Sequence, residues 1–324
     1  MPVDVAHSRV RIGPGQKAHR PLALGCWSFG SNQWTGAEDA NLLAAMDAAL
    51  HCGITHFDTA VDYGDGYSEQ LIGRFMIGKR DQVFVASKAN PSKLTAQHML
   101  DQVDASLRRL QTDTIDLYYI HWPRRGKDMR PVMEGLEIAR RQGKIAAIGV
   151  SNFTVEQMRQ VAEVGTIDAH QLGYNLIWRF AERDILPYCR THKIAVVTYS
   201  SIAHGILTGK YPRDVQIPKG DQRAGILPFR ADVWPNVYAG VEQLKAIAQE
   251  VGRPLAHLAI RWILQQPGIT SVLVGARNAA QIEENASALA GEVIADAVFE
   301  RMTAISDVIM QHMPDVGNVY DYYP

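Results

Sequence analysis

Short apolar runs alternate with longer amphipathic segments along most of the chain. Apolar runs of this length are typical of strands buried on both faces of a parallel sheet, because such strands show no polar face. We count eight of them, at residues 22–26, 54–60, 82–89, 115–121, 145–151, 168–175, 194–200 and 270–276.

The segments between the runs have the spacing of helices that cover a sheet. In the stretch 95–111, Met99, Val103, Leu107 and Leu110 recur at steps of three and four residues, which places them on one helix face. The helix patterns that precede the second and fifth runs end at Gly53 and Gly143, and glycine is the usual left-handed stop of a helix.

Eight strand and helix units predict an α/β fold, a (β/α)8 TIM barrel formed by residues 1–324 as a single domain. The length of 324 residues agrees, since α/β barrels use about 250 residues as one unit. The alternative is an open, doubly wound sheet.

Three segments depart from the repeat. A turn at Gly13–Gln16 predicts an N-terminal β-hairpin, and residues 211–235, rich in proline and charge, predict a long loop after the seventh strand. From Val293 onward the pattern predicts an extra C-terminal helix, followed by the aromatic tail MPDVGNVYDYYP. The loop and the tail give no readable pattern from which a substrate could be chosen.

Composition narrows the classes of partner. The net charge is −1, with 47% hydrophobic and 21% charged residues, so we expect no nucleic acid or membrane partner and favour a small molecule. Three scattered cysteines, no run long enough to span a bilayer and no secretory or lipidation signal predict a cytoplasmic protein. The oligomeric state cannot be read from these features.

Four polar side chains lie where the predicted strands end, which in such a barrel is the catalytic face. Asp58 ends the second strand, Tyr63 follows in its loop, Lys88 ends the third strand and His121 ends the fourth. Each residue alone has an ordinary structural explanation, such as a turn former or a packed tyrosine. Four at successive strand ends indicate an active site.

These four groups can deliver a proton to an oxygen that gains negative charge. A phenol with an ordinary pKa near 10 needs a nearby cation to act at neutral pH, and Lys88 can supply it if Asp58 holds its charge. His121 can hydrogen-bond the substrate oxygen and orient it. If the oxygen belongs to a carbonyl, a cofactor must supply the hydride.

Longer motifs around these residues resemble those of the aldo-keto reductase superfamily, in order from about residue 22 to 285. They are HFDTAVDYGDGYSEQLIG at 56–73, SK at 87–88, YIHW at 119–122, GVSNF at 149–153 and GILTGKY at 205–211. The resemblance implies a catalytic tetrad of Asp58, Tyr63, Lys88 and His121, with NADPH bound across the barrel mouth.

The resemblance also implies the residues around the cofactor. It places the nicotinamide carboxamide on Ser151, Asn152 and Gln171, with Tyr199 stacked on the ring and Trp27 and Asp58 in the same site. The pyrophosphate residues would be Ser200, Ser201, Ile202, Gly205, Leu207 and Lys210, and the adenosine phosphate and adenine residues would be Gly275, Arg277, Gln281, Glu284 and Asn285. Arg277 favours NADPH over NADH, because a guanidinium suits a 2′-phosphate.

The sequence departs from the family pattern at two places near the predicted cofactor site. Ser201-Ile202 stand where the family commonly has Pro-Leu, and Val274 stands where it commonly has a proline. Contacts through backbone N–H groups would survive these changes.

Aromatic side chains after the strands or in the long loop are candidates for the wall of a substrate pocket. We expect Trp27, Trp122 and Trp178, with Tyr63 and His121, to contact a carbonyl or alcohol substrate. Phe229, Trp34 and Trp234 are weaker candidates, and ordinary rim packing explains Trp34 and Trp234 at least equally well. We expect no metal site, since His51, Cys52 and His56 do not form a converging set in the sequence.

The predicted function is reversible, NADPH-dependent reduction of aldehydes or ketones to alcohols. Two alternatives remain at this stage. Lys88 could form a Schiff base in a lyase, as in barrel aldolases, or the chain could be a nicotinamide-binding auxiliary subunit with little catalysis.

Overall fold

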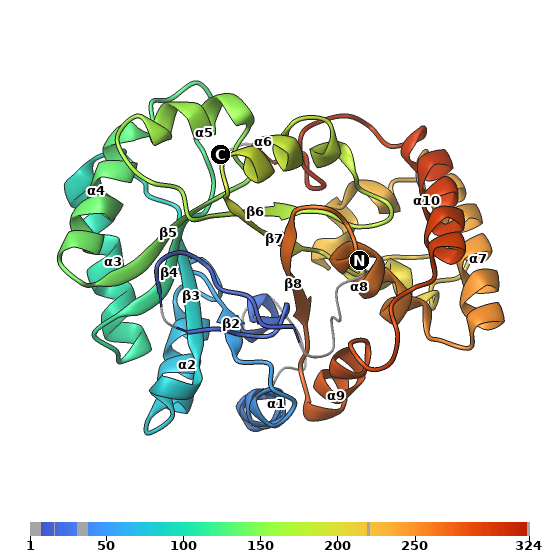
Figure 1. Cartoon of the computed structure of the whole chain (residues 1–324), viewed down its shortest axis with the longest axis horizontal. Coiled ribbons are helices and arrows are strands. Elements are labelled where there is room, and N and C mark those ends of the chain that lie inside the picture. The colour runs from blue at the N-terminus through green and yellow to red at the C-terminus, as the bar shows by residue number, and fades with distance from the viewer. Residues whose placement is uncertain (1–7, 16, 31–37, 219–220, 323–324) are drawn as a thin grey trace.

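Eight parallel strands form a closed barrel in the computed structural model of the chain, which describes residues 8–15, 17–30, 38–218 and 221–322 (Figure 1). The strands are β1 (Leu22–Gly25), β2 (His56–Asp58), β3 (Phe84–Ala89), β4 (Ile115–Ile120), β5 (Ile145–Ser151), β6 (Ala169–Gly173), β7 (Ala195–Tyr199) and β8 (Ile269–Gly275). All eight fall on the predicted apolar runs. Because β1 also pairs with β8, from Leu22 with Val272 to Gly25 with Gly275, the TIM barrel is confirmed and the open sheet is wrong.

Helices surround the barrel and alternate with its strands (Figure 1). They are α1 (Asp39–His51), α2 (Tyr67–Met76), α3 (Ala96–Leu110), α4 (Arg130–Arg141), α5 (Val155–Ala162), α6 (Ile185–Thr191), α7 (Trp234–Val251), α8 (Leu255–Leu264), α9 (Ala279–Ser287) and α10 (Asp296–Met310). The α3 helix confirms the periodic stretch 95–111, with Thr95 accepting a hydrogen bond from the His98 N–H as its N-cap. No helix within the described ranges is both long and apolar enough to cross a membrane.

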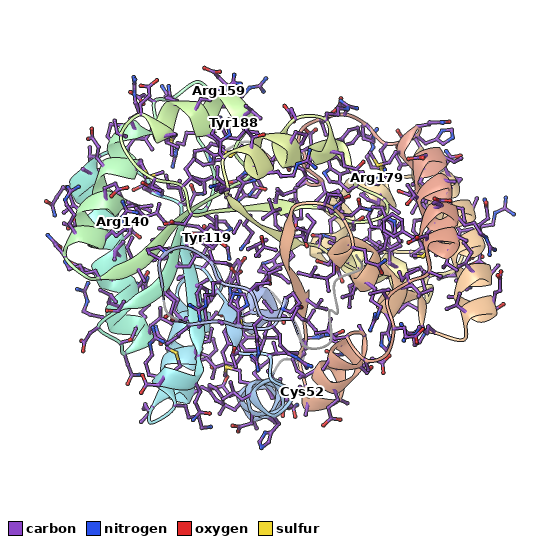
Figure 2. The ribbon with its side chains drawn as sticks, viewed as in Figure 1. Cys52, Tyr119, Arg140, Arg159, Arg179 and Tyr188 are labelled. Atoms are coloured by element: carbon purple, nitrogen blue, oxygen red, sulfur yellow. The ribbon has the colours of Figure 1, made fainter. Side chains whose placement is uncertain are left out.

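Strand alternation divides the core into two parts. Outward-facing strand residues pack against the helices, whereas Ala23, Phe84, Ala86, Leu117, Tyr119, Ala147, Ala169, Val197 and Leu273 fill the barrel interior. Tyr119 lies near the centre of the molecule in Figure 2. Its ring occupies space that a side chain at Gly149 would take, since a Cβ there would lie 2.2 Å from the Tyr119 ring. A glycine on β5 therefore lets a large ring fill the barrel.

The N-terminal segment covers the barrel at the end where the strands begin. Val10 and His19 form an antiparallel bridge, which supports the predicted hairpin, although Gln16 of its turn lies outside the described residues. Ile12 is buried with the interior cluster, and the blue N-terminal segment crosses the strands in Figure 1. The hairpin thus closes one mouth of the barrel and leaves the chemistry to the other.

The long loop after β7 ends earlier than predicted and contains short turns. Its described part contains the 3-10 turns η5 (Gln222–Gly225) and η6 (Leu227–Phe229), and α7 already begins at Trp234. The predicted boundary at residue 235 is therefore wrong by two residues. Pro235 lies in the first turn of α7, where the missing N–H of a proline costs nothing.

The predicted extra helix is α10, and Arg179 ties it to the loop after β6. The Arg179 guanidinium donates to Glu182 at 2.8 Å and to Asp307 of α10 at 2.6 Å, and lies 5.4 Å from the Trp262 ring centroid (Figure 2). After α10 the tail returns across the barrel, where the Leu227 N–H donates to the Val319 carbonyl at 3.1 Å. This return brings the tail to the open mouth.

Candidate active site

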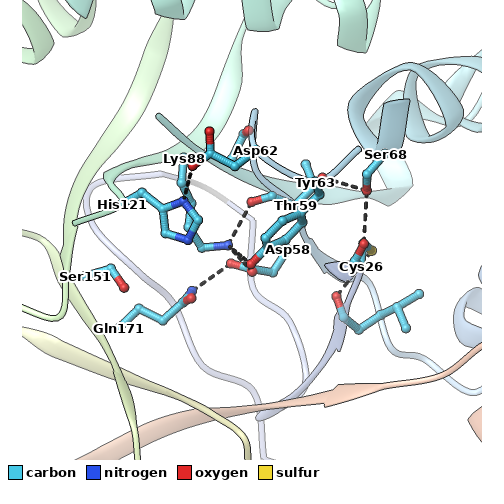
Figure 3. Close-up of polar contacts among 12 residues, drawn as sticks. Cys26, Asp58, Thr59, Asp62, Tyr63, Ser68, Lys88, His121, Ser151 and Gln171 are labelled. Carbon is cyan, nitrogen blue, oxygen red and sulfur yellow. Dashed lines mark hydrogen bonds and ion pairs between the residues drawn. The ribbon is translucent and has the colours of Figure 1, made fainter. Parts of the chain in front are cut away.

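The four predicted catalytic residues gather at the carboxyl ends of β2, β3 and β4. Lys88 has the same inward parity on β3 as Phe84 and Ala86 of the barrel interior, so strand alternation points it into the barrel. Asp58 is the last residue of β2 and His121 directly follows β4. Figure 3 shows the side chains of Asp58, Tyr63, Lys88 and His121 in one cluster.

Lys88 is the centre of this cluster and is completely buried. Its Nζ donates to Asp58 Oδ1 at 2.5 Å, to the Thr59 carbonyl at 2.8 Å and to the Tyr63 hydroxyl at 3.4 Å (Figure 3). Three acceptors match the three hydrogens of an ammonium group. The contacts with a carboxylate and a carbonyl stabilise the charged amine, so Lys88 presents a cation to the phenol.

Tyr63 keeps its proton at neutral pH. Burial, followed by the carboxylate of Asp58, raises the pKa of Tyr63 well above its usual value. We expected the Lys88 cation to favour the ionised phenol, but its closest contacts are with Asp58 and Thr59, and the 3.4 Å contact does not offset burial. The Tyr63 hydroxyl therefore carries a proton, which is the state that the predicted role as a donor requires.

His121 lies against both the phenol and a second acid. Its ring centroid is 5.9 Å from that of Tyr63, with the rings nearly perpendicular, and its Nδ1 lies 3.2 Å from Asp62 Oδ2. Burial lowers the pKa of His121, and Lys88 acts in the same direction, whereas Asp62 opposes them. His121 is thus neutral at physiological pH.

The three residues predicted to hold a carboxamide lie together but contact one another. Gln171 Nε2 donates to Asp58 Oδ2 at 2.7 Å, which makes the amide a second partner of the buried carboxylate. Asn152 donates from Nδ2 to Ser151 Oγ at 3.0 Å and accepts at Oδ1 from the Tyr199 hydroxyl at 2.7 Å. These amides and hydroxyls offer both donors and acceptors, as the carboxamide of a nicotinamide requires.

The ring of Tyr199 is stacked on Tyr320 of the C-terminal tail. The ring centroids lie 6.2 Å apart with planes inclined by 19°. The Tyr320 ring also stands edge-on to Trp27, Trp122 and His204, at centroid distances between 5.7 and 6.4 Å. The tail thus occupies a face of the aromatic ring that the sequence assigns to the cofactor.

The segment after β7, where the pyrophosphate is predicted to bind, bends through several left-handed residues. Positive φ angles occur at Ser200, Ala203, His204 and Gly205, and such turns direct successive N–H groups to one side. Lys210 lies close, with its Cε 3.5 Å from where a Cβ of Gly205 would lie. The Ala203 and Gly205 N–H groups already donate to the Ser200 and Ile202 carbonyls at 2.7 and 3.0 Å, so the pyrophosphate site in this segment stays a prediction.

Two predicted pyrophosphate residues direct their side chains into the protein. Ser201 donates from Oγ to the Leu273 carbonyl at 2.9 Å, and Leu207 is fully buried in the core. Ile202 precedes the 3-10 turn η4 (Ala203–Thr208) and packs against the core. Their side chains are thus not directed to a phosphate, and the Leu207 N–H already donates to the Ile202 carbonyl at 3.2 Å.

The predicted adenosine residues lie at the carboxyl end of β8, just before α9 and along α9. Gln281 Oε1 accepts from the Arg277 N–H at 2.8 Å, and Asn285 Nδ2 donates to the Gly275 carbonyl at 3.4 Å. Glu284 pairs with His257 of α8 at 2.8 Å. The Arg277 side chain is exposed, as a group that captures a phosphate from solvent must be.

The predicted substrate aromatics separate into two groups. Trp27 and Trp122 belong to the ring cluster at the mouth, where Trp122 also contacts Tyr322 at 5.0 Å. Trp178 is buried after β6 with its ring edge against Phe180. Of the weaker candidates, Phe229 and Trp234 stack on each other at 5.4 Å, and Trp34 lies outside the described residues.

Sequence reasoning did not single out Asp62 and Tyr320, which the structure places against His121 and Tyr199. Asp62 lies next to Tyr63 in the motif, but an aspartate before Tyr-Gly is also an ordinary turn former. No local pattern brings Tyr320 to Tyr199, because their contact depends on the path of the whole C-terminal segment. Within the described residues, no group of three or more His, Cys, Asp or Glu side chains is arranged to hold a metal ion.

Comparison with known proteins identifies the family. The model of the Aldo/keto reductase family matches residues 21–307, so the chain belongs to this family of oxidoreductases. The chain is 38% identical over 276 residues to the aldo-keto reductase YhdN of Bacillus subtilis, covering 81% of this chain and 82% of that protein. It is 31% identical over 292 residues to the NADH-specific methylglyoxal reductase of Escherichia coli, covering 83% and 89%.

Solved structures agree with the fold. The glycerol dehydrogenase AKR11B4 of Gluconobacter oxydans superposes with a TM-score of 0.85 at 32% identity, covering 95% of this chain and 96% of that one. An aldo-keto reductase of Klebsiella pneumoniae in complex with NADPH superposes with a TM-score of 0.75 at 27% identity, covering 97% and 99%.

Proposed function

We propose that this chain interconverts a small carbonyl compound and its alcohol with NADP(H), using Tyr63 as the proton donor in reduction and the acceptor in oxidation. The observation that carries the proposal is the contact chain from Asp58 through Lys88 to the Tyr63 hydroxyl at the barrel mouth. The NADPH complex of the related Klebsiella enzyme supports the choice of cofactor.

The chain's own residues supply binding, orientation and a proton. When bound, reduced nicotinamide supplies a hydride to the carbonyl carbon. The Tyr63 hydroxyl then gives its proton to the carbonyl oxygen, and Lys88 stabilises the phenolate that remains, since an ammonium group is already within hydrogen-bonding distance. Asp58 keeps Lys88 in place throughout the step.

The 2′-phosphate is the feature that would distinguish NADPH from NADH. Arg277 at the start of α9 supports NADPH, because its exposed guanidinium can pair with a phosphate. The relative that is NADH-specific shows that a chain of this family can use the other cofactor. The names of the relatives, a methylglyoxal reductase and a glycerol dehydrogenase, support small oxygenated substrates.

The lyase alternative is disfavoured by the contacts of Lys88. A Schiff base requires a neutral amine with a free lone pair, whereas Lys88 donates to three acceptors, one of them a carboxylate. Borohydride treatment with a carbonyl substrate would leave Lys88 unmodified if it acts only as a cation.

Removing the Tyr63 hydroxyl tests the proposal. Tyr63→Phe should lower kcat for carbonyl reduction by at least about 100-fold, the usual contribution of a proton donor, and leave the Kd for NADPH within about twofold. NADPH oxidation with a panel of aldehydes, ketones and hydroxy-carbonyl compounds would measure the first, and fluorescence titration the second.

Tyr67→Phe is the matched control, since the Tyr67 hydroxyl donates to Asp39 at 2.5 Å on the outer side of the barrel. Its turnover should match that of the unmodified protein. Undiminished turnover in Tyr63→Phe would overturn the proposal.

A further inference from the structure

A groove of about 590 Å³ lies between α2 and α3 on the outer side of the barrel. Side chains of both helices line it, and the described ones are Tyr67, Gln70, Arg74, Ala105, Arg108, Arg109 and Gln111. No residue of the catalytic cluster and no aspartate or glutamate is among these described lining residues. The groove thus has the volume of a small-molecule site, and its charged lining groups are guanidinium groups.

Arg109 is held in the groove by a buried partner. Its Nε donates to Glu69 Oε2 at 2.5 Å and its Nη2 donates to Ser106 Oγ at 3.3 Å, and Glu69 is completely buried. A Cβ at Gly66 would lie 2.6 Å from Arg109 Cδ, so the glycine that precedes α2 leaves room for the arginine stem. A guanidinium has five N–H groups, so others remain for a ligand after these contacts.

Arg74 and Arg108 add two more positive charges from exposed positions. Arg74 Nη2 donates to Asp39 Oδ2 at 2.8 Å, and the other oxygen of Asp39 accepts from the Tyr67 hydroxyl at 2.5 Å. One edge of Arg74 is therefore already paired. Arg108, in contrast, forms an ion pair with none of the described residues. Its charge is available to a bound anion.

The charges of the groups that line or contact the groove leave a positive balance. Three guanidinium groups stand against the two carboxylates that contact them, Asp39 and Glu69, which leaves one positive charge. Glu69 lies beneath the groove, where its second oxygen accepts from Ser87 Oγ at 2.5 Å. The groove is lined by the first turn of α2 and the last turn of α3, whose opposite dipoles offset each other. The arginines therefore decide which ligand the groove attracts.

We propose that this groove binds a small phosphorylated compound through Arg74, Arg108 and Arg109. A guanidinium pairs with phosphate oxygens through two parallel N–H groups, and a phosphoryl group carries about −1.5 to −2 charges and three acceptor oxygens. Gln70 and Gln111 are exposed and supply amide donors and acceptors for the rest of such a molecule. Because no catalytic residue is among the described lining residues, this binding goes beyond the proposed function and does not depend on it.

Calorimetric titration with inorganic pyrophosphate, at constant ionic strength and with NADP+ at saturation, tests the proposal. The bound NADP+ occupies the predicted cofactor phosphate sites, so binding of pyrophosphate that remains belongs to another site. We expect a Kd of about 0.1–1 mM, as for a few exposed charge-assisted contacts. Inorganic phosphate should bind about three- to tenfold more weakly, because it has one phosphoryl group to pair with the arginines.

Two variants locate this binding. Arg108→Gln should raise the Kd for pyrophosphate about three- to tenfold, and the double variant with Arg74→Gln should bind none saturably. Arg141→Gln is the matched control, since Arg141 is an exposed arginine in the last turn of the neighbouring helix α4, and its Kd should be unchanged. An unchanged Kd for NADPH would show that each variant is folded.

Two results would overturn the proposal. One is the absence of saturable pyrophosphate binding to the protein saturated with NADP+. The other is a Kd for pyrophosphate that Arg108→Gln leaves unchanged or that Arg141→Gln raises equally, because binding would then not depend on the groove.

Discussion

At the scale of single residues, the buried pair of Lys88 and Asp58 combines catalysis with a cost to stability. Their side chains are 0% and 2% exposed. Removing two charges from water costs free energy. The attraction between the charges offsets this cost only while both partners and their hydrogen bonds remain. The site therefore contains a buried ion pair that the stability of the barrel core does not require.

The variant Lys88→Met should be strongly destabilised, because Asp58 would keep only its hydrogen bond from Gln171 inside the barrel. We expect a loss of about 3–5 kcal/mol in the free energy of unfolding, measured by urea denaturation. The double variant Asp58→Leu with Lys88→Met should regain most of this loss, since an apolar pair carries no desolvation cost. A double variant no more stable than the single one would refute the explanation.

At the scale of elements, the C-terminal tail connects the outer helix α10 with the catalytic mouth. Asn318 holds the turn, since its Oδ1 accepts from the Tyr320 and Tyr322 N–H groups at 3.1 and 3.2 Å. Val319 is buried, and Tyr320 thereby reaches Tyr199. A segment that looks like a sparse tail in the sequence is thus part of the mouth.

Replacing Tyr320 tests whether the tail competes with the nicotinamide for the Tyr199 ring. Tyr320→Ala should lower the Kd for NADPH roughly two- to tenfold, because an aromatic stacking contact is worth about 0.5–1.5 kcal/mol. Tyr322→Ala is the control, since that ring contacts Trp122. Weaker binding in Tyr320→Ala would show instead that Tyr320 supports the bound cofactor.

The elements also show what sequence could and could not predict. The strands were predictable because parallel strands covered on both faces are apolar throughout, and Lys88 and Asp58 stood out as ionisable residues at the ends of such runs. The side-chain directions of Ser201 and Leu207 were not, because the 3-10 turn after β7 bends through positive φ at Ala203, a residue with no such preference. The contact of Asp62 with His121 was not predictable either, because it depends on a loop that brings the two residues together from different strands.

At the scale of the whole molecule, several buried histidines make stability depend on pH. Burial lowers the pKa of His56 well below its ordinary value and that of His170 to about 3. His56 lies against His19 and Phe84 at the closed end of the barrel, and neither of its ring nitrogens has a hydrogen-bond partner among the described residues. Below pH about 6.5 the unfolded chain takes up protons that the folded chain excludes.

The free energy of unfolding should therefore fall as pH decreases from about 6.5 toward 3, by about 1.4 kcal/mol per pH unit for each such histidine. His56→Leu should reduce this slope by one proton, whereas replacement of the exposed His312 with Gln should not. Urea denaturation at a series of pH values measures the slope. A slope that is the same in His56→Leu and the unmodified protein would contradict the assignment.

The pairing of β1 with β8 also matters before the protein is complete. Leu22 of β1 is paired with Val272 of β8. The strand that covers this edge of β1 is therefore synthesised some 250 residues after β1 itself. At ribosomal rates of about 5–20 residues per second, the edge of β1 stays open for roughly 10–50 s. During that interval the nascent chain carries an unpaired apolar strand edge, which is a template for intermolecular pairing, so chaperones that protect such edges would act mainly before the last strand is synthesised.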